Sequence, residues 1–139
     1  MKRVRSTPVM QVGRRVRARD YLEVVADPAA TEPLVRIGDD VRLGRFFIVW
    51  STVGVEIGNR VQAGDSVTVM DCWVKPGWPT NGPAGARVTI GDDVTLGPNC
   101  VIGPGVTVGA GADIAPCATV WDDVPPGAVV VGSPGQVIK

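Results

Sequence analysis

The clearest feature of the chain is a six-residue period of apolar and polar positions. From residue 88 onward it reads VTIGDD, VTLGPN, CVIGPG, VTVGAG, ADIAPC and ATVWDD without a break. The first and third positions of each hexad are apolar, and the last three are mostly Gly, Asp, Asn or Pro. Residues i and i+2 of a strand face the same side, so each hexad predicts a short strand followed by a turn.

The same period occurs earlier in the chain. From residue 35 it reads VRIGDD, VRLGRF and FIVWST, and after a two-residue slip at Val53–Gly54 it continues VEIGNR, VQAGDS and VTVMDC. A face two apolar residues wide cannot enclose a core alone, but stacked coils bury it continuously. The pattern predicts an all-β solenoid over residues 35–139, with residues 1–34 as an N-terminal arm or cap.

One long loop interrupts this repeat. The stretch VTVMDCWVKPGWPTNGPAG, Val67 to Gly85, leaves the hexad pattern after residue 69 and contains Trp73 and Trp78. We expect an inserted loop at 70–86. Two Trp residues in a loop indicate that it packs on something, either a neighbouring subunit or its own coil.

Charge is unevenly distributed although the formal net charge is zero. Seven of the fourteen basic residues precede Asp20, so the rest of the chain holds seven bases against fourteen acids, a net of −7. These seven are Lys2, Arg3, Arg5, Arg14, Arg15, Arg17 and Arg19. The basic arm could meet a polyanion. Because no aromatic residues alternate with these arginines, an acidic surface of the same or a neighbouring subunit is the favoured partner, and nucleic acid is not expected.

The composition also bears on metals and location. The chain has no histidine, and its three cysteines, Cys72, Cys100 and Cys117, form no CxxC pair, which argues against a zinc site and a disulfide framework. The paired carboxylates of the two GDD turns, 38–40 and 91–93, are better explained as solvated turns than as a cation site. No apolar run is long enough to span a bilayer and no leader is apparent, so we expect a cytoplasmic protein.

The repeat resembles a known family. The pattern [IVL]-G-x-x-[VCA]-x over residues 35–69 and 88–123 is similar to that of hexapeptide-repeat proteins. The resemblance implies a left-handed parallel β-helix with three hexads in each triangular coil, hence about four coils, and a homotrimer with the prisms side by side.

The C-terminal tail points to one branch of that family. Val124-Pro125-Pro126-Gly127 and Val131-Gly132-Ser133-Pro134 resemble the tails of the sugar and maltose O-acetyltransferase group. The resemblance implies transfer of an acetyl group from acetyl-CoA to a hydroxyl or amine of a small sugar-type acceptor. Acetyl-CoA would be a co-substrate, and no permanently bound cofactor is expected.

The catalytic loop departs from this branch. The family's loop often reads DHxH and carries a histidine base, whereas this chain keeps the acid as Asp71 and has Cys72 and Val74 where the histidines are expected. Asp71 would serve as a base if burial raised its pKa, and Cys72 as a nucleophile if its thiolate were stabilised. The alternative is that both are ordinary turn residues.

The resemblance also assigns contacts to acetyl-CoA, and several of them are altered. Pro98 and Pro116 stand at turns whose backbone N–H groups would bind pantetheine, and proline has no N–H to donate. Trp121-Asp122 and Gln136 replace phosphate partners. The remaining candidates for the cofactor contact are Gly109, Ala110 and Lys139.

Three hypotheses follow. The first is an acyltransferase with non-standard catalytic residues. The second is a catalytically inactive member that acts as an oligomeric scaffold or as a partner of an active homologue. The third is a polyanion-binding module that uses the basic arm.

Overall fold

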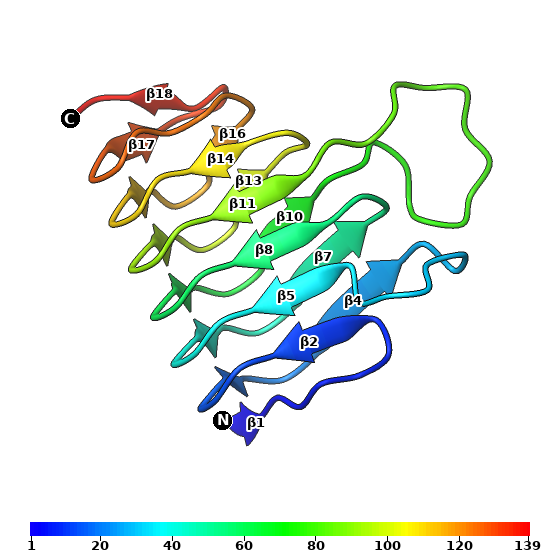
Figure 1. The fold of residues 1–139 in the computed structure, drawn as a ribbon. Helices are drawn as coiled ribbons and strands as arrows, with labels where there is room; N and C mark the ends of the chain where they lie inside the picture. The colour runs from blue at the N-terminus through cyan, green and yellow to red at the C-terminus, as the bar shows by residue number, and fades with distance from the viewer.

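The computed structural model describes residues 1–139 and contains strands and turns but no helix. Successive strands wind around a three-sided prism, whose long axis runs from the N-terminal to the C-terminal end (Figure 1). Each side of the prism is one sheet, named here A, B or C.

The strands are assigned to the three sheets as follows. Sheet A contains β1 (Lys2–Arg3), β3 (Arg17–Ala18), β6 (Arg42–Leu43), β9 (Gln62–Ala63), β12 (Thr95–Leu96), β15 (Asp113–Ile114), β17 (Val129–Val131) and β18 (Gln136–Val137). Sheet B contains β2 (Met10–Val12), β5 (Val35–Ile37), β8 (Val55–Ile57), β11 (Val88–Ile90) and β14 (Thr107–Val108). Sheet C contains β4 (Leu22–Ala26), β7 (Phe47–Ser51), β10 (Thr68–Met70), β13 (Val101–Ile102) and β16 (Thr119–Val120).

Neighbouring coils are in parallel register, which agrees with the predicted left-handed parallel β-helix. On sheet B, for example, Ile37 lies beside Ile57, Ile57 beside Ile90, and Ile90 beside Val108. These positions all point inward, so each side chain stacks on its equivalent in the next coil. One continuous core results, as the hexad pattern requires.

The helix begins earlier than the sequence pattern indicated. Strands β2, β3 and β4 pair in parallel with β5, β6 and β7. Residues 10–26 therefore form a first coil, which brings the number of complete coils to five. The predicted boundary between an arm at 1–34 and a helix at 35–139 is wrong, because Met10, Val16 and Ala18 are buried in the same core as the later hexads.

The predicted core is confirmed in the unbroken block of hexads. Its first- and third-position side chains are all buried: Val88, Ile90, Val94, Leu96, Cys100, Ile102, Val106, Val108, Ala112, Ile114, Ala118 and Val120. Only two polar residues, Ser51 and Asp71, are buried with them. This pair lies where the inserted loop leaves the prism.

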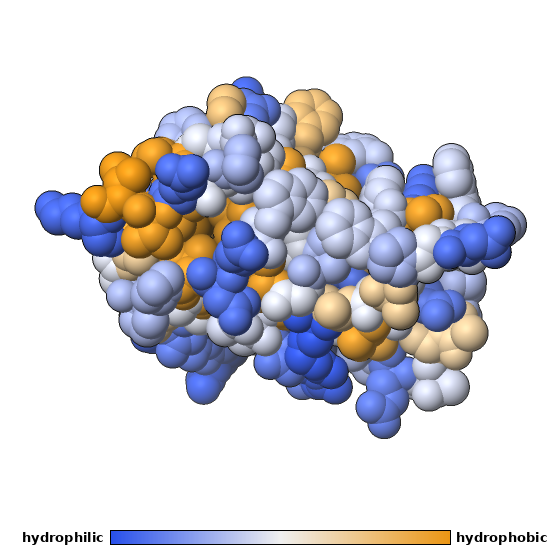
Figure 2. All heavy atoms as spheres, turned by 90° about the horizontal axis from the view of Figure 1, so that it is seen from above, coloured by the Kyte–Doolittle hydropathy of each residue, from blue (hydrophilic) through white to orange (hydrophobic).

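The two ends of the prism are closed by antiparallel strands. β1 pairs with β3 at the N-terminal end, and β18 pairs with β17 at the C-terminal end. Figure 2, which looks onto the C-terminal end, shows apolar side chains gathered near the chain terminus, where Val137 and Ile138 are exposed. No helix in the structure is long and apolar enough to cross a membrane.

Candidate functional site

The inserted loop emerges where each coil turns from sheet C to sheet B, an edge named here the C–B corner. Residues 71–87 connect β10 to β11 and project from the prism as a long excursion (Figure 1). The coils on either side contribute residues 52–54, 103–105 and 121–123 to the same corner. The predicted loop at 70–86 is therefore present, and segments distant in sequence surround its base.

Asp71 is fully buried at the base of this loop, and its carboxylate accepts a set of hydrogen bonds. Ser51 Oγ donates at 2.8 Å, and the backbone N–H groups of Thr52, Val53 and Gly54 donate at 2.8, 3.0 and 2.6 Å. Val53 and Gly54 are the two-residue slip between the third and fourth hexads, and Ser51 and Thr52 end the third hexad. The carboxylate thus satisfies the backbone groups that the slip leaves without partners on the neighbouring coil.

This arrangement bears on the expected catalytic role of Asp71. A carboxylate has about four lone-pair positions, and here four donors within 3.0 Å occupy them, with the Thr52 hydroxyl as a fifth donor at 3.4 Å. Taking a proton from a substrate would require Asp71 to give up bonds that hold the corner together. The contacts favour the alternative in which Asp71 is a structural residue.

Cys72 is buried beside Asp71. Burial, followed by the charge of Asp71 and a hydrogen bond with it, raises the pKa of the Cys72 thiol to about 11. Because only the thiolate is an effective nucleophile, this residue is in its unreactive form near neutral pH. The surroundings of Cys72 likewise favour a packing role.

A pair of stacked indoles lies beside these two residues. Trp73 and Trp121 have ring centroids 5.7 Å apart and an interplanar angle of 12°, and both are substantially exposed. Trp121 lies over Gly103, where an added Cβ would come within 2.3 Å of the indole Cε3. Glycine at this position gives the indole room to lie flat on the corner. The sequence patterns single out each Trp but not their stacking.

A small cavity opens on the other side of Trp73. It has a volume of about 190 Å³ and is lined by loop residues that include Cys72, Trp73, Lys75 and Trp78. The loop therefore encloses a space of its own rather than lying flat on the prism. Its walls combine aromatic faces, a thiol and one ammonium group.

The other expected contacts lie at different corners of the prism. Gly109 and Ala110 lie at the corner where the chain passes from sheet B to sheet A. Lys139 lies near the same corner, where its backbone carbonyl accepts a hydrogen bond from Val129 N at 3.1 Å. Pro98 and Pro116 are at the corner between sheets A and C. Within one chain these residues do not form a single site with Asp71 and Cys72.

The aspartates of the GDD turns have structural partners. Asp39 accepts from Arg14 N and Asp92 from Asn59 N, at 2.8 and 2.7 Å. Asp93 forms an ion pair of 2.8 Å with Arg60. These carboxylates link one coil to the next at the corner between sheets B and A.

The comparisons with known proteins agree with this architecture. Residues 87–120 match the family model of the bacterial transferase hexapeptide (six repeats). Residues 87–120 therefore carry the hexapeptide repeat of this family, and the resemblance inferred from the hexads is confirmed for the repeat and the fold. A comparison with curated proteins finds no match.

Several solved structures with the same fold are acyltransferases. A hexapeptide-repeat acetyltransferase from Vibrio cholerae is 23% identical, with 91% of this chain and 71% of that chain covered and a TM-score of 0.76. AntD, an N-acyltransferase from Bacillus cereus, is 20% identical, with 94% and 72% covered and a TM-score of 0.79. A maltose O-acetyltransferase from Clostridium difficile is 24% identical, with 94% and 70% covered and a TM-score of 0.73. At these identities the likeness establishes the fold.

Proposed function

We propose that the chain is an acyltransferase that moves an acyl group from acyl-CoA to an amine on a sugar-type acceptor. Proteins of this fold use such donors: the Vibrio cholerae acetyltransferase binds acetyl-CoA, and the Bacillus cereus enzyme binds 3-hydroxybutyryl-CoA together with dTDP. The C–B corner, with its inserted loop, is the proposed acceptor site.

The choice of an amine rests on one observation, the lack of a free base at this corner. Asp71 is engaged by four donors, the Cys72 thiol is protonated, and the chain has no histidine. A hydroxyl needs a base to become a good nucleophile, whereas a neutral amine is one already. An amine acceptor is therefore the substrate that can react without a basic side chain at this corner.

The proposed step needs no proton acceptor from the protein. The amine nitrogen attacks the thioester carbonyl, the C–S bond breaks, and an amide bond forms. CoA leaves as a thiolate and takes up the proton that the amine loses, so the step is balanced between the two substrates. The contribution of the chain is to hold them together in the right orientation.

The stacked indoles support a ring-shaped acceptor. Trp73 and Trp121 expose flat aromatic faces beside the loop cavity, and aromatic faces supply large apolar contact areas with little loss of side-chain freedom. The apolar face of a sugar ring would rest on this surface. In this arrangement the indoles position the acceptor without taking part in the chemistry.

We further propose that the working unit is a homotrimer formed through sheet C. The outward residues of its successive strands include Val25, Trp50 and Met70, which are direct neighbours in the register. Trp50 Nε1 is buried without a hydrogen-bond partner in the single chain. An apolar stripe with an unpaired donor is what a subunit contact would cover and satisfy.

The test compares amino sugars with matched sugars that have a hydroxyl in place of the amine, such as glucosamine and glucose. With acetyl-CoA as donor, we expect thiol release and N-acetylated product only with amines. The rate should rise with pH as the acceptor amine loses its proton, and Cys72→Ala should leave it unchanged. O-acetylation of the matched sugars at comparable rates would refute the amine assignment.

A second candidate is favoured by the same structural observation. If the engaged Asp71 and the protonated Cys72 reflect lost chemistry, the chain is an inactive scaffold or a partner of an active homologue. Calorimetry with acetyl-CoA at millimolar concentration separates the two functions. Binding of acetyl-CoA is expected for the transferase, and its absence would leave the scaffold as the function.

A further inference from the structure

A column of arginines crosses the outer face of sheet A at its N-terminal end. Arg3 pairs with Arg17, and Arg17 pairs with Arg42, on three adjacent strands. Like charges directly opposite one another in a sheet are destabilising. None of the three forms an ion pair, whereas Arg15, Arg60 and Arg87 each do. The column therefore keeps three uncompensated charges side by side.

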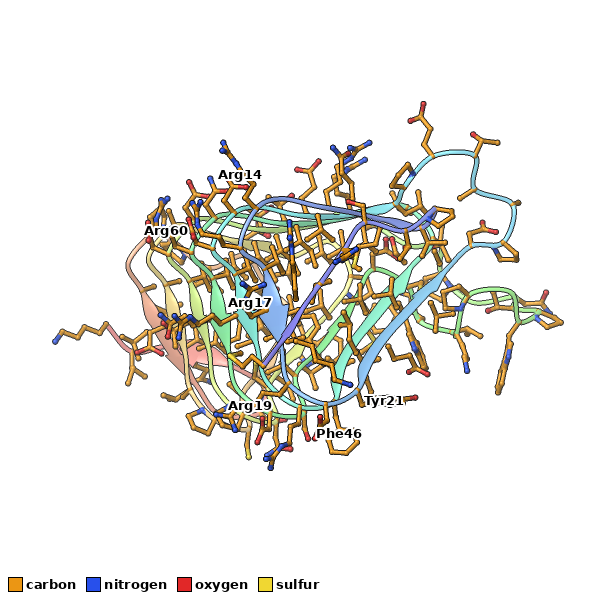
Figure 3. The ribbon with its side chains drawn as sticks, turned by 90° about the horizontal axis from the view of Figure 1, so that it is seen from below. Arg14, Arg17, Arg19, Tyr21, Phe46 and Arg60 are labelled. Carbon is orange, nitrogen blue, oxygen red and sulfur yellow. The ribbon has the colours of Figure 1, made fainter.

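More basic groups continue this column toward the corner between sheets A and C. A cavity of about 340 Å³ there is lined by Lys2, Arg19 and Arg45, together with Met1, Ala18 and Asp20. In Figure 3, which looks onto the N-terminal end, Arg17 and Arg19 lie along the same side of the prism. We name the six residues Arg3, Arg17, Arg42, Lys2, Arg19 and Arg45 the basic band.

Two exposed aromatic rings stand at the end of this band. Tyr21 and Phe46 occupy equivalent positions of the first two coils, with ring centroids 5.6 Å apart and exposed fractions of 57% and 50% (Figure 3). Both have left-handed backbones, with φ of 63° and 55°. Bulky residues rarely adopt this conformation, and later coils place the smaller Ser66 and Asn99 here. The rings are thus held outward where smaller residues would suffice for the turn.

We propose that the basic band and the Tyr21–Phe46 pair form a binding site for single-stranded nucleic acid. Arginine and lysine side chains neutralise the phosphates of such a ligand, and exposed aromatic rings stack on bases that are not paired. A duplex would satisfy only the first requirement, because its bases are already stacked.

This inference reverses an expectation from the sequence. Nucleic acid was not expected because no aromatic residues alternate with the arginines before Asp20. Coiling brings Tyr21 and Phe46 together beside Arg19 and Arg45, so the missing rings are supplied by the corner of the prism. The proposed site covers sheet A and the corner between sheets A and C, away from the loop cavity at the C–B corner, and goes beyond the proposed transferase function.

The first test measures the salt dependence of binding to a fluorescently labelled oligothymidylate by anisotropy. We expect binding at about 50 mM salt that weakens steeply as salt is raised. In the double variant Arg17→Gln/Arg42→Gln, the slope of log affinity against log salt should fall by about 0.7 for each guanidinium removed. The charge-matched control Arg36→Gln/Arg87→Gln, on sheet B and its flank, should keep the slope of the unmodified chain.

The second test addresses the aromatic rings. The variant Tyr21→Asn/Phe46→Asn replaces both rings with asparagine, a residue that tolerates the left-handed backbone of these positions. It should lower affinity for the oligothymidylate on the order of tenfold. Its affinity for heparin and for a duplex should not change, and circular dichroism should show the same strand content.

The proposal is overturned if no salt-sensitive binding to the oligonucleotide occurs at low salt. It is also overturned if heparin, duplex or anionic vesicles bind as tightly and the aromatic variant changes nothing.

Discussion

A single buried carboxylate organises the turn beside the inserted loop. Asp71 receives its donors from residues 51–54, the coil immediately before its own. An internal anion thus fills a site made by consecutive backbone N–H groups, as a bound anion would in other proteins. The acid at this position accordingly has a structural explanation that does not require catalysis.

The substitution Asp71→Asn tests this role. The amide keeps one acceptor oxygen but places an NH₂ group among buried donors, so we expect a loss of about 3 kcal/mol in the free energy of unfolding. Urea denaturation should show a lower midpoint with an unchanged slope. The matched control is Asp65→Asn, because exposed Asp65 accepts a single bond, from Arg45 N at 2.7 Å, and should change stability by less than about 1 kcal/mol. If Asp71→Asn abolished turnover at unchanged stability, Asp71 would be the catalytic base.

At the scale of elements, the loop and the last full coil depend on each other. Trp73 lies near the start of the loop, and Trp121 lies in the turn after β16. The stacking of the two indoles therefore connects the loop to the prism. Gly103 lies on the coil between them, and its lack of a side chain leaves room for the Trp121 indole to lie flat on the corner. The geometry of the proposed acceptor wall therefore depends on a glycine that contacts no substrate.

The substitution Gly103→Ala is expected to displace the Trp121 indole. The new methyl group would lie 2.3 Å from Cε3, so the ring must tilt away from Trp73. We expect a changed near-ultraviolet circular dichroism signal and a rise of about tenfold in the KM of an amine acceptor, with kcat nearly unchanged, because a positioning surface is lost. The control Gly132→Ala, between β17 and β18, where an added Cβ would meet only Pro134 O at 3.6 Å, should leave both quantities unaltered, although the left-handed φ of 89° there costs some stability. An unchanged KM together with a displaced indole would show that the stack is not part of the acceptor site.

The elements also show what the pattern of residues can predict. The hexads from residue 35 onward predicted the strands, the inserted loop and the buried positions, because each coil repeats the same local rule. The first coil was missed because its hexad at 16–21, VRARDY, places Arg where later hexads have Gly. Its arginines were interpreted as an arm, although Arg17 points outward from an ordinary strand.

The site was harder to predict than the fold, for a physical reason. The partners of Asp71 come from an irregular turn on another coil, and the Trp73–Trp121 stack joins a loop to a turn two coils later. Such contacts depend on how coils align across the prism, which the period alone does not specify. The hexad repeat led to the right fold, while Gly109, Ala110 and Lys139, the residues that the family resemblance assigned to the cofactor contact, lie on another edge of the prism than Asp71 and Cys72.

At the scale of the whole molecule, the three faces of the prism differ in character. Sheet A carries the arginine column, while sheet C presents Val25, Trp50 and Met70 in one row. Trp121 extends that row over Gly103, which places the C–B corner next to the proposed subunit contact. A trimer through sheet C would therefore bring a neighbouring chain close to the loop cavity, and would offer a route by which residues from different corners share one site.

The substitution Met70→Glu tests this assembly. A carboxylate in the middle of the apolar row would have to be buried without a partner, so we expect the trimer to dissociate. Light scattering coupled to size exclusion should give three times the chain mass for the unmodified protein and the single-chain mass for the variant. Thr89→Glu places the same charge at an outward position of sheet B and should leave the trimer intact. If Thr89→Glu separates the subunits and Met70→Glu does not, the contact lies on sheet B. In that case Trp50 Nε1 must find its acceptor elsewhere, and the loop cavity would be a site of the single chain.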